Sequence, residues 1–180
     1  MAVRTIIAAL SAGLAMFACA QAQENAAAEE ATNEAAASEE AAPEMSAAER
    51  SAAFLAENAK REGVMTTASG LQYEIVARSA QGGRRPTKKS IVVVHYIGML
   101  MNGAVFDSSV ARGAPDTFRV DGVISGWSEG LQLMTAGEKY RFFIPPALAY
   151  GEKGVPSANI GPDEMLIFDV ELIRVGRASF

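Results

Sequence analysis

The chain has 180 residues, enough for one domain of ordinary size plus extensions. Residues 1–50 hold eight of its 21 acidic residues but only two of its 16 basic ones, which leaves 13 acidic and 14 basic residues in 51–180. A nearly neutral domain lacks the basic stripe that nucleic acid requires, and the single cysteine excludes a disulfide framework.

Residues 1–22 have the pattern of a secretory signal peptide. A basic residue precedes an apolar run, here 6–18, and the small residues that follow fit an A-x-A cleavage site. Because the run is too short to span a bilayer comfortably, we expect cleavage, export to the periplasm or the medium, and no transmembrane span in the mature chain. The alternative is a membrane-anchored lipoprotein acylated at Cys19. Met16 and Phe17 disfavour it because they match the lipoprotein pattern poorly.

Residues 23–45 consist almost entirely of Ala, Glu, Asn, Ser and Gln. Such a segment cannot bury enough apolar surface to offset the entropy that is lost on ordering. We therefore expect a disordered acidic tether between the signal peptide and the folded part.

Residues 46–63 predict a lead-in helix. Ser46 and Glu49 have the spacing of a capping box, Phe54 and Leu55 follow at helical spacing, and a glycine ends the run. The apolar stripe is thin, which favours a solvated helix. An isolated strut, a dimer contact and a packed edge element remain open alternatives.

Residues 64–180 are predicted to form the folded domain, where strand patterns replace the helical one. Alternating or β-branched runs predict four strands, at 71–76, 91–96, 140–144 and 165–173. An Asn-Gly pair at 102–103 predicts a hairpin after the second of them.

Residues 123–134 predict a short amphipathic helix between the second and third strands. Trp127, Leu131 and Met134 share one face at i, i+4 and i+7. Gly130 lies on much the same side and would let a sheet backbone approach closely. Strands in series around one helix give an α+β domain, with an antiparallel sheet folded over this helix. Trp127, the only tryptophan of the chain, is a candidate floor for an apolar pocket.

The folded part lacks the side chains that most kinds of enzymatic catalysis require. His95 is the only histidine, and the lone cysteine lies in the predicted signal peptide, which excludes a zinc site or a Cys-His pair. Ser108 and Ser109 lack a nucleophile elbow, and no glycine-rich loop has the Lys and hydroxyl of a phosphate cradle. His95 lies within a strand and is expected to be a hydrogen-bonded core residue. We expect neither a metal nor a cofactor.

A set of aromatic and aliphatic residues with one acid among them remains at the ends of the predicted elements. The set comprises Tyr96, Phe106, Asp107, Val123, Ile124, Trp127, Tyr150 and Phe168. Each residue alone could be an ordinary core residue. Together they indicate an apolar pocket.

Three long stretches carry a more specific signal: VHYIGMLMNGAVFDSS (94–109), RGAPDTFRVDGVISGWSEGLQLMTAGEKYRFFIPPALAYGEKGVP (112–156) and LIFDVELIRV (166–175). They resemble the FKBP-type peptidyl-prolyl cis-trans isomerases. The preceding FLAENAKREGVMTTASGLQYEIV (54–76) resembles the macrophage infectivity potentiator-like subgroup of the bacterial envelope. That subgroup commonly has an N-terminal helical dimerisation region. Because the predicted tether occupies much of that place here, the oligomeric state stays open.

The resemblance implies an antiparallel sheet wrapped around a short helix, with a ligand pocket between them. It also implies isomerisation of X-Pro bonds in unfolded or exported proline-containing polypeptides, while macrolide binding is left open. The matching catalytic positions are Phe106, Asp107 and Tyr150. The matching substrate-binding positions are Tyr96, Phe118, Val123, Ile124, Trp127, Ile160 and Phe168. By the same resemblance, the Ile124 N–H and the Tyr150 hydroxyl bind substrate carbonyls.

The expected rim of the pocket departs from the single-domain prototypes of this family. Asp116 replaces an aromatic residue, Val155 takes a position often held by His, and the loop at 157–162 is longer than usual. Substrate preference is expected to depend on these positions. The alternative function is that of a periplasmic chaperone or peptide-binding module with little isomerase activity.

Overall fold

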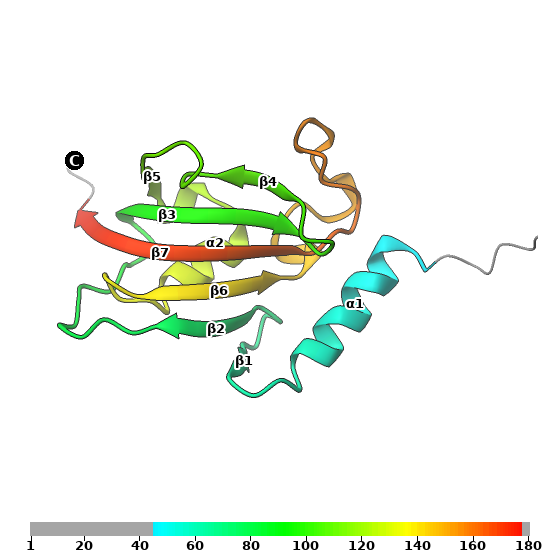
Figure 1. Cartoon of the computed structure of the whole chain (residues 1–180), viewed down its shortest axis with the longest axis horizontal. Coiled ribbons are helices and arrows are strands. Elements are labelled where there is room, and N and C mark those ends of the chain that lie inside the picture. The colour runs from blue at the N-terminus through cyan, green and yellow to red at the C-terminus, as the bar shows by residue number, and fades with distance from the viewer. Residues whose placement is uncertain (1–44, 178–180) are drawn as a thin grey trace, which may run out of the picture. The chain divides into compact units, whose positions relative to one another are not determined.

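An antiparallel sheet of seven strands organises the described part of the chain (Figure 1). The computed structural model describes residues 45–177, so the predicted signal peptide and nearly all of the predicted tether lie outside the described residues. The strands are β1 (Val64–Thr66), β2 (Gln72–Ala77), β3 (Ser90–Leu100), β4 (Val105–Ser108), β5 (Asp116–Arg119), β6 (Lys139–Ile144) and β7 (Leu166–Arg177). Their order is β1-β2-β6-β7-β3-β4, and β5 also pairs with β3. The four predicted strands and the α+β class are confirmed, and β1, β4 and β5 are additional.

Within residues 45–177, two α-helices accompany the sheet, α1 (Ala47–Asn58) and α2 (Ser125–Leu131). Four short 3₁₀ turns lie in the connections, at Val120–Gly122, Pro146–Leu148, Gly151–Lys153 and Pro156–Ala158. α2 lies across one face of the sheet, behind β6 and β7 in Figure 1. Among the residues described, no helix is both long and apolar enough to cross a membrane.

β3 shows how the sheet separates two faces. Its residues alternate strictly between buried and half-buried positions from Ser90 to Leu100. The buried set includes Val92, Val94 and Tyr96, which join α2 in the hydrophobic core. We call this side of the sheet the inner face and the other side the outer face. The predicted β-branched run is thus fully buried on the inner face only.

α2 lies close to the inner face because two of its glycines meet β6. A Cβ atom at Gly126 would lie 2.5 Å from Cγ2 of Ile144, and one at Gly130 would lie 2.6 Å from the ring of Phe142. The close approach expected at Gly130 is present, but the group that approaches is the Phe142 side chain and not the sheet backbone. Trp127, between these glycines in sequence, is only 4% exposed.

α2 ends at Leu131, three residues before the predicted end. The N–H groups of Leu133 and Met134 donate to carbonyls three residues back, those of Gly130 (3.0 Å) and Leu131 (3.3 Å). This spacing makes a tighter turn than an α-helix and ends it. Met134 is fully buried. The apolar spacing therefore predicted burial correctly and helix length wrongly.

The predicted hairpin at 102–103 is confirmed and joins β3 to β4. Gly103 has φ of +84°, a conformation that favours glycine. The turn brings β4 alongside β3, with Asp107 opposite Gly98 in the register. Phe106 and Asp107 are positioned in this way.

α1 is a packed edge element, so the expectation of a solvated helix is wrong. The predicted capping box at its start is present. The Ser51 hydroxyl donates to the carbonyl of Asp163 (2.9 Å), and the Asn58 side chain donates to that of Gln72 (2.8 Å). These two polar residues are buried. A thin apolar stripe gives no sign of such contacts, and they attach α1 to the sheet and to the segment before β7.

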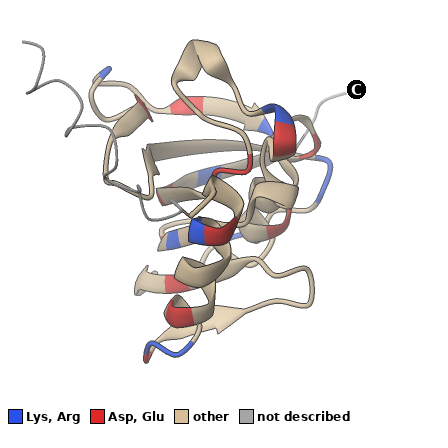
Figure 2. Cartoon of the chain, turned by 90° about the vertical axis from the view of Figure 1, so that its right-hand side faces the viewer, with Lys and Arg blue, Asp and Glu red and all other residues tan. Residues whose placement is uncertain are grey.

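Charged residues of both signs are interspersed over the side of the molecule that Figure 2 draws. The loop between β2 and β3 differs, because residues 78–89 contain five basic residues and no acidic one. The near-neutral composition therefore conceals one local concentration of positive charge.

Candidate active site

A cavity of about 530 Å³ lies between α2 and the inner face of the sheet. This volume is within the range of roughly 300–1,000 Å³ that is usual for ligand sites. Nine of the ten predicted site residues line it: Tyr96, Phe106, Asp107, Phe118, Val123, Ile124, Trp127, Tyr150 and Phe168. Gly122 is an additional lining residue.

Ile160, the tenth predicted residue, does not line this cavity. It is 2% exposed and belongs to the hydrophobic core. Its backbone pairs with that of Val155, with N–H to carbonyl distances of 2.8 and 3.1 Å in the two directions. Ile160 therefore supports the loop from inside.

Three aromatic rings stand almost perpendicular to the indole of Trp127. The planes of Tyr96, Phe118 and Phe168 are inclined to it by 88°, 86° and 82°, with ring centroids 5.2, 5.7 and 5.2 Å away. Such edge-to-face contacts are favourable geometry for aromatic pairs. Trp127 thus forms a floor from which aromatic walls rise. Its Nε1 is the one buried side-chain nitrogen or oxygen of the described part that has no hydrogen-bond partner.

Gly98 of β3 makes room for two of the walls. A Cβ atom at this position would lie 2.7 Å from the ring of Phe106 and 2.8 Å from that of Phe168. These two rings are themselves perpendicular, at 88°, with centroids 5.5 Å apart. A side chain at Gly98 would therefore displace both rings.

A polar cluster occupies the rim of the cavity. The Tyr96 hydroxyl donates to Oδ2 of Asp107, and Nη1 of Arg112 donates to Oδ1 of the same carboxylate. Nη2 of Arg112 donates to Asp116 and lies 3.1 Å from the Tyr96 hydroxyl oxygen. The guanidinium carbon lies 5.7 Å from the centre of the Tyr96 ring. Asp107 is therefore held on both oxygens.

Two groups of this cluster have pKa values that are shifted further from neutral pH. Partial burial raises the pKa of the Asp107 carboxyl, but hydrogen bonds from Tyr96 and Arg112 and the charge of Arg112 outweigh it, so the pKa falls below its ordinary value. Burial, followed by the hydrogen bond to Asp107, raises the pKa of Tyr96 to about 12. At neutral pH the cavity thus contains an ionised Asp107 and a neutral Tyr96.

Tyr150 stands at the rim and is 40% exposed. It immediately precedes the 3₁₀ turn Gly151–Lys153, and the carbonyl of Gly151 accepts a hydrogen bond from the Asp163 N–H at 2.9 Å. Its phenol is therefore accessible to a ligand and is carried by a loop that is closed on itself.

His95 is a structural residue on the outer face. It is half-buried, and its Nδ1 lies 3.0 Å from the Oγ of Ser109. Ser109 is fully buried and accepts a hydrogen bond from the Tyr96 N–H at 2.8 Å. The expected hydrogen bond is present, but His95 lies at the surface of the sheet and outside the core.

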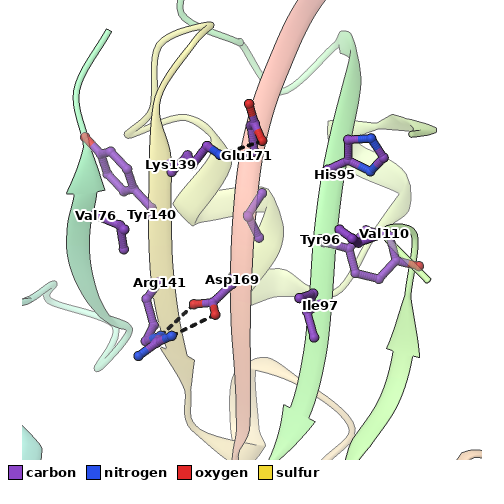
Figure 3. A pocket seen from close by; sticks show the side chains of 11 residues that line it. Val76, His95, Tyr96, Ile97, Val110, Lys139, Tyr140, Arg141, Asp169 and Glu171 are labelled. Carbon is purple, nitrogen blue, oxygen red and sulfur yellow. Dashed lines mark hydrogen bonds and ion pairs between the residues drawn. The ribbon is translucent and has the colours of Figure 1, made fainter. Parts of the chain in front are cut away.

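A second cavity, of about 230 Å³, lies on the outer face (Figure 3). Its charged side chains neutralise one another: Arg141 donates to both oxygens of Asp169 (2.5 and 2.7 Å), and Lys139 pairs with Glu171 (3.0 Å). Figure 3 shows the pair of Arg141 and Asp169 bridging β6 and β7. This hollow offers no enclosed aromatic floor.

Sequence reasoning did not identify Gly98 or Arg112 as part of the site. A glycine within a strand is a signal for the close approach of another group, and it could have identified Gly98. Arg112 has no comparable local signal, because its partners lie at different separations along the chain. Among the residues described, no group of three or more His, Cys, Asp or Glu is placed to hold a metal ion.

Two family models match the chain. The first, described as FKBP-type peptidyl-prolyl cis-trans isomerase, matches residues 82–173. The second, described as the domain amino terminal to FKBP-type peptidyl-prolyl isomerase, matches residues 1–75.

Three relatives illustrate the similarity. A probable FKBP-type isomerase FkpA from Neisseria meningitidis is 52% identical over 69% of this chain and 44% of its own length. The FKBP-type 22 kDa isomerase of Escherichia coli is 50% identical over 68% and 58%. The outer membrane protein MIP of Legionella longbeachae is 46% identical over 71% and 53%. The chain spans about half the length of these relatives.

Solved structures agree with the fold. FkpA from Escherichia coli superposes with a TM-score of 0.68 at 44% identity, covering 72% of this chain and 59% of that one. A peptidyl-prolyl cis-trans isomerase from Pseudomonas syringae also has a TM-score of 0.68, at 36% identity, and is covered over 98% of its length and 76% of this chain.

Proposed function

This chain belongs to the FKBP-type peptidyl-prolyl cis-trans isomerase family, and on that premise we propose that it catalyses rotation about X-Pro bonds in exported polypeptides. The observation that carries the proposal is the cavity, with an indole floor, perpendicular aromatic walls, and polar groups confined to the rim.

An apolar cavity can catalyse this reaction without a reactive side chain. Rotation about a peptide bond has a barrier of about 18–20 kcal/mol because the C–N bond has double-bond character, and X-Pro bonds therefore isomerise over tens to hundreds of seconds. The planar amide separates charge more than the twisted amide does, because twisting breaks the resonance that places negative charge on oxygen. A dry, weakly polar site therefore disfavours the planar ground state more than the twisted transition state.

The required effect is modest. Lowering the barrier by about 4 kcal/mol would raise the rate about a thousandfold. Trp127, Phe106 and Phe168 supply shape and exclude water. The Tyr150 hydroxyl and the Ile124 N–H orient the substrate through its carbonyls.

Asp107 acts as a fixed negative charge. Both of its oxygens accept hydrogen bonds, from Tyr96 and from Arg112, and its pKa is lowered despite partial burial. A carboxylate held in this way neither attacks the substrate nor takes up a proton near neutral pH. Its charge acts on the dipole of the amide that rotates beside it.

The envelope is the proposed location, with unfolded or exported proline-containing chains as substrates. The predicted signal peptide at 1–22 supports export, and the mass of the mature N-terminus distinguishes cleavage from lipidation at Cys19. The same cavity would bind a macrolide, and inhibition by such a compound tests this directly.

The test is the refolding of a protein whose slow phase is limited by a proline isomer. We expect the wild type to accelerate that phase. In Phe106→Ala and Asp107→Ala the acceleration should be at least about tenfold smaller, which corresponds to a barrier higher by about 1.4 kcal/mol. Val110→Ala is the control, because Val110 is 53% exposed and lines the outer hollow instead. Equal acceleration by the wild type and both cavity variants would refute the proposed site.

Peptide binding without catalysis is the second candidate. It is favoured by Val105 beside Phe106, which is 57% exposed, and by the accessible Tyr150. A binding module of this kind would suppress aggregation equally well in Tyr150→Phe and Asp107→Ala. An isomerase would lose rate in both variants.

A further inference from the structure

Arg112 holds two carboxylates at the rim of the cavity. Its guanidinium donates to Asp107 from Nη1 and to Asp116 from Nη2. Within the described residues neither carboxylate pairs with another cation. Two negative charges therefore share one positive charge, and the cluster has a formal net charge of −1.

Asp116 belongs to the cavity side of β5. In a strand, residues two apart point to the same side, and Phe118, two residues after Asp116, forms a wall of the cavity. In the register of β5 with β3, Phe118 lies opposite Val92 and Asp116 lies opposite Val94. Asp116 thus extends the Phe118 wall along the strand.

The cluster is accessible to a ligand. The side chains of Asp107, Arg112 and Asp116 are 41%, 47% and 33% exposed, so each retains contact with solvent while its partners hold it in place. Asp107 lines the cavity directly, and the two donor nitrogens of a single guanidinium keep the Asp116 carboxylate near it. A chain bound with its proline over Trp127 must therefore pass a rim with excess negative charge.

We propose that Asp116 makes this rim selective for polypeptide segments with Lys or Arg next to the proline, and against segments with Asp or Glu there. The inference rests on the proposed function, because it assumes that the cavity accepts an X-Pro segment. Arg112 balances only one of the two negative charges that it contacts, and removing the charge of Asp116 would leave the cluster neutral. Asp116 is in this sense a specificity-determining residue.

The expected effect is moderate and sensitive to salt. Charges near a protein surface interact through a high effective dielectric, so changing a neighbouring Lys to Glu should alter kcat/KM by about fivefold at low ionic strength. The Debye length falls to about 3 Å at 1 M salt, so the preference should shrink below about twofold there.

The test uses peptides that differ only at the residue before or after the proline, with Lys, Gln or Glu at that position. Isomerisation is measured as kcat/KM. Binding is measured separately from the fluorescence of Trp127, which is the only tryptophan in the chain. We expect the order Lys, Gln, Glu in both measurements for the wild type, and a Lys-to-Glu ratio close to one for Asp116→Asn.

Glu171→Gln is the matched control. Glu171 is also an ion-paired carboxylate, 38% exposed, but it lies on the outer face with Lys139. This variant changes the net charge by the same amount and should keep the wild-type ratio. An Asp116→Ser variant repeats the test if the amide of Asn forms new contacts with Arg112.

The outcomes separate the two proposals. Isomerisation and binding that ignore peptide charge, or a preference that survives in both Asp116 variants, would overturn the role of Asp116 and leave the isomerase intact. A charge preference in binding that disappears in Asp116→Asn, with no isomerisation of any peptide, would support the role of Asp116 and refute the proposed function. If no peptide binds, both are rejected.

Discussion

The two faces of the sheet are built from the same strands and differ in what covers them. On β3, Tyr96 turns to the inner face and meets Trp127, whereas His95 turns to the outer face and meets Ser109. The inner face lies under α2 and encloses an aromatic cavity, and the outer hollow contains paired charges. The presence of a cavity by itself therefore says little about function. The inner cavity is suited to chemistry because its walls are apolar and its few polar groups are held at the rim.

The largest expected effect comes from a substitution that disturbs the inner face alone. Gly98→Ala would place a methyl group 2.7 Å from the Phe106 ring and 2.8 Å from the Phe168 ring. Overpacking of this kind costs about 1–3 kcal/mol, and we expect kcat/KM for X-Pro isomerisation to fall at least tenfold because both walls shift. Urea denaturation and the peptide assay measure the two effects.

Gly176→Ala is the matched control in the same sheet, because the nearest atom to its Cβ would be 3.6 Å away. We expect little change in either measurement for this variant. If Gly98→Ala kept wild-type activity and stability, the walls would not depend on that glycine.

A smaller effect is expected from substitutions on the outer face. Arg141 and Asp169 form a bidentate pair, yet their side chains are 41% and 34% exposed, so solvent screens the pair. We expect a coupling energy of about 0.5–1 kcal/mol from a double-mutant cycle of Arg141→Ala and Asp169→Ala. The isomerase rate should stay unchanged in all three variants. A severalfold loss of rate would show that the two faces are not functionally separate.

The smallest expected effect is that of pH. The stability contributed by Asp107, whose folded pKa is lowered, is present above its unfolded value near 3.9 and is lost as the pH falls through the folded value. The contribution of Tyr96 is present below about 10 and is lost as the pH rises through its folded pKa of about 12. Between about pH 5 and 9 neither group titrates, so kcat/KM should vary by less than about twofold.

A pH series of kcat/KM with one uncharged peptide checks this expectation. A bell-shaped profile would indicate acid–base catalysis at the cavity.

The features that could be predicted are those with a local signal. The four longest strands contain alternating or β-branched runs that are long enough to be recognised. Gly130 was identified because a glycine inside an apolar helix face needs a packing reason. β4 and β5 have four residues each, too few for a periodic pattern. The packing of α1 was not favoured because it depends on two buried polar residues, Ser51 and Asn58, whose hydrogen-bond partners lie 112 and 14 residues away.

By itself, the sequence determined the α+β class and the central helix with its indole, since apolar periodicity is written in consecutive residues. Nine of the residues that line the cavity followed from the resemblance of its long motifs to a known family. Only the tertiary structure decided that Gly98 makes room for two rings, that Ile160 lies in the core, and that Arg112 joins Asp107 to Asp116. Such contacts depend on distances between strands, and these arise only when the sheet is assembled. The charge at the rim is therefore a property of the fold, although each residue that creates it can be read in the sequence.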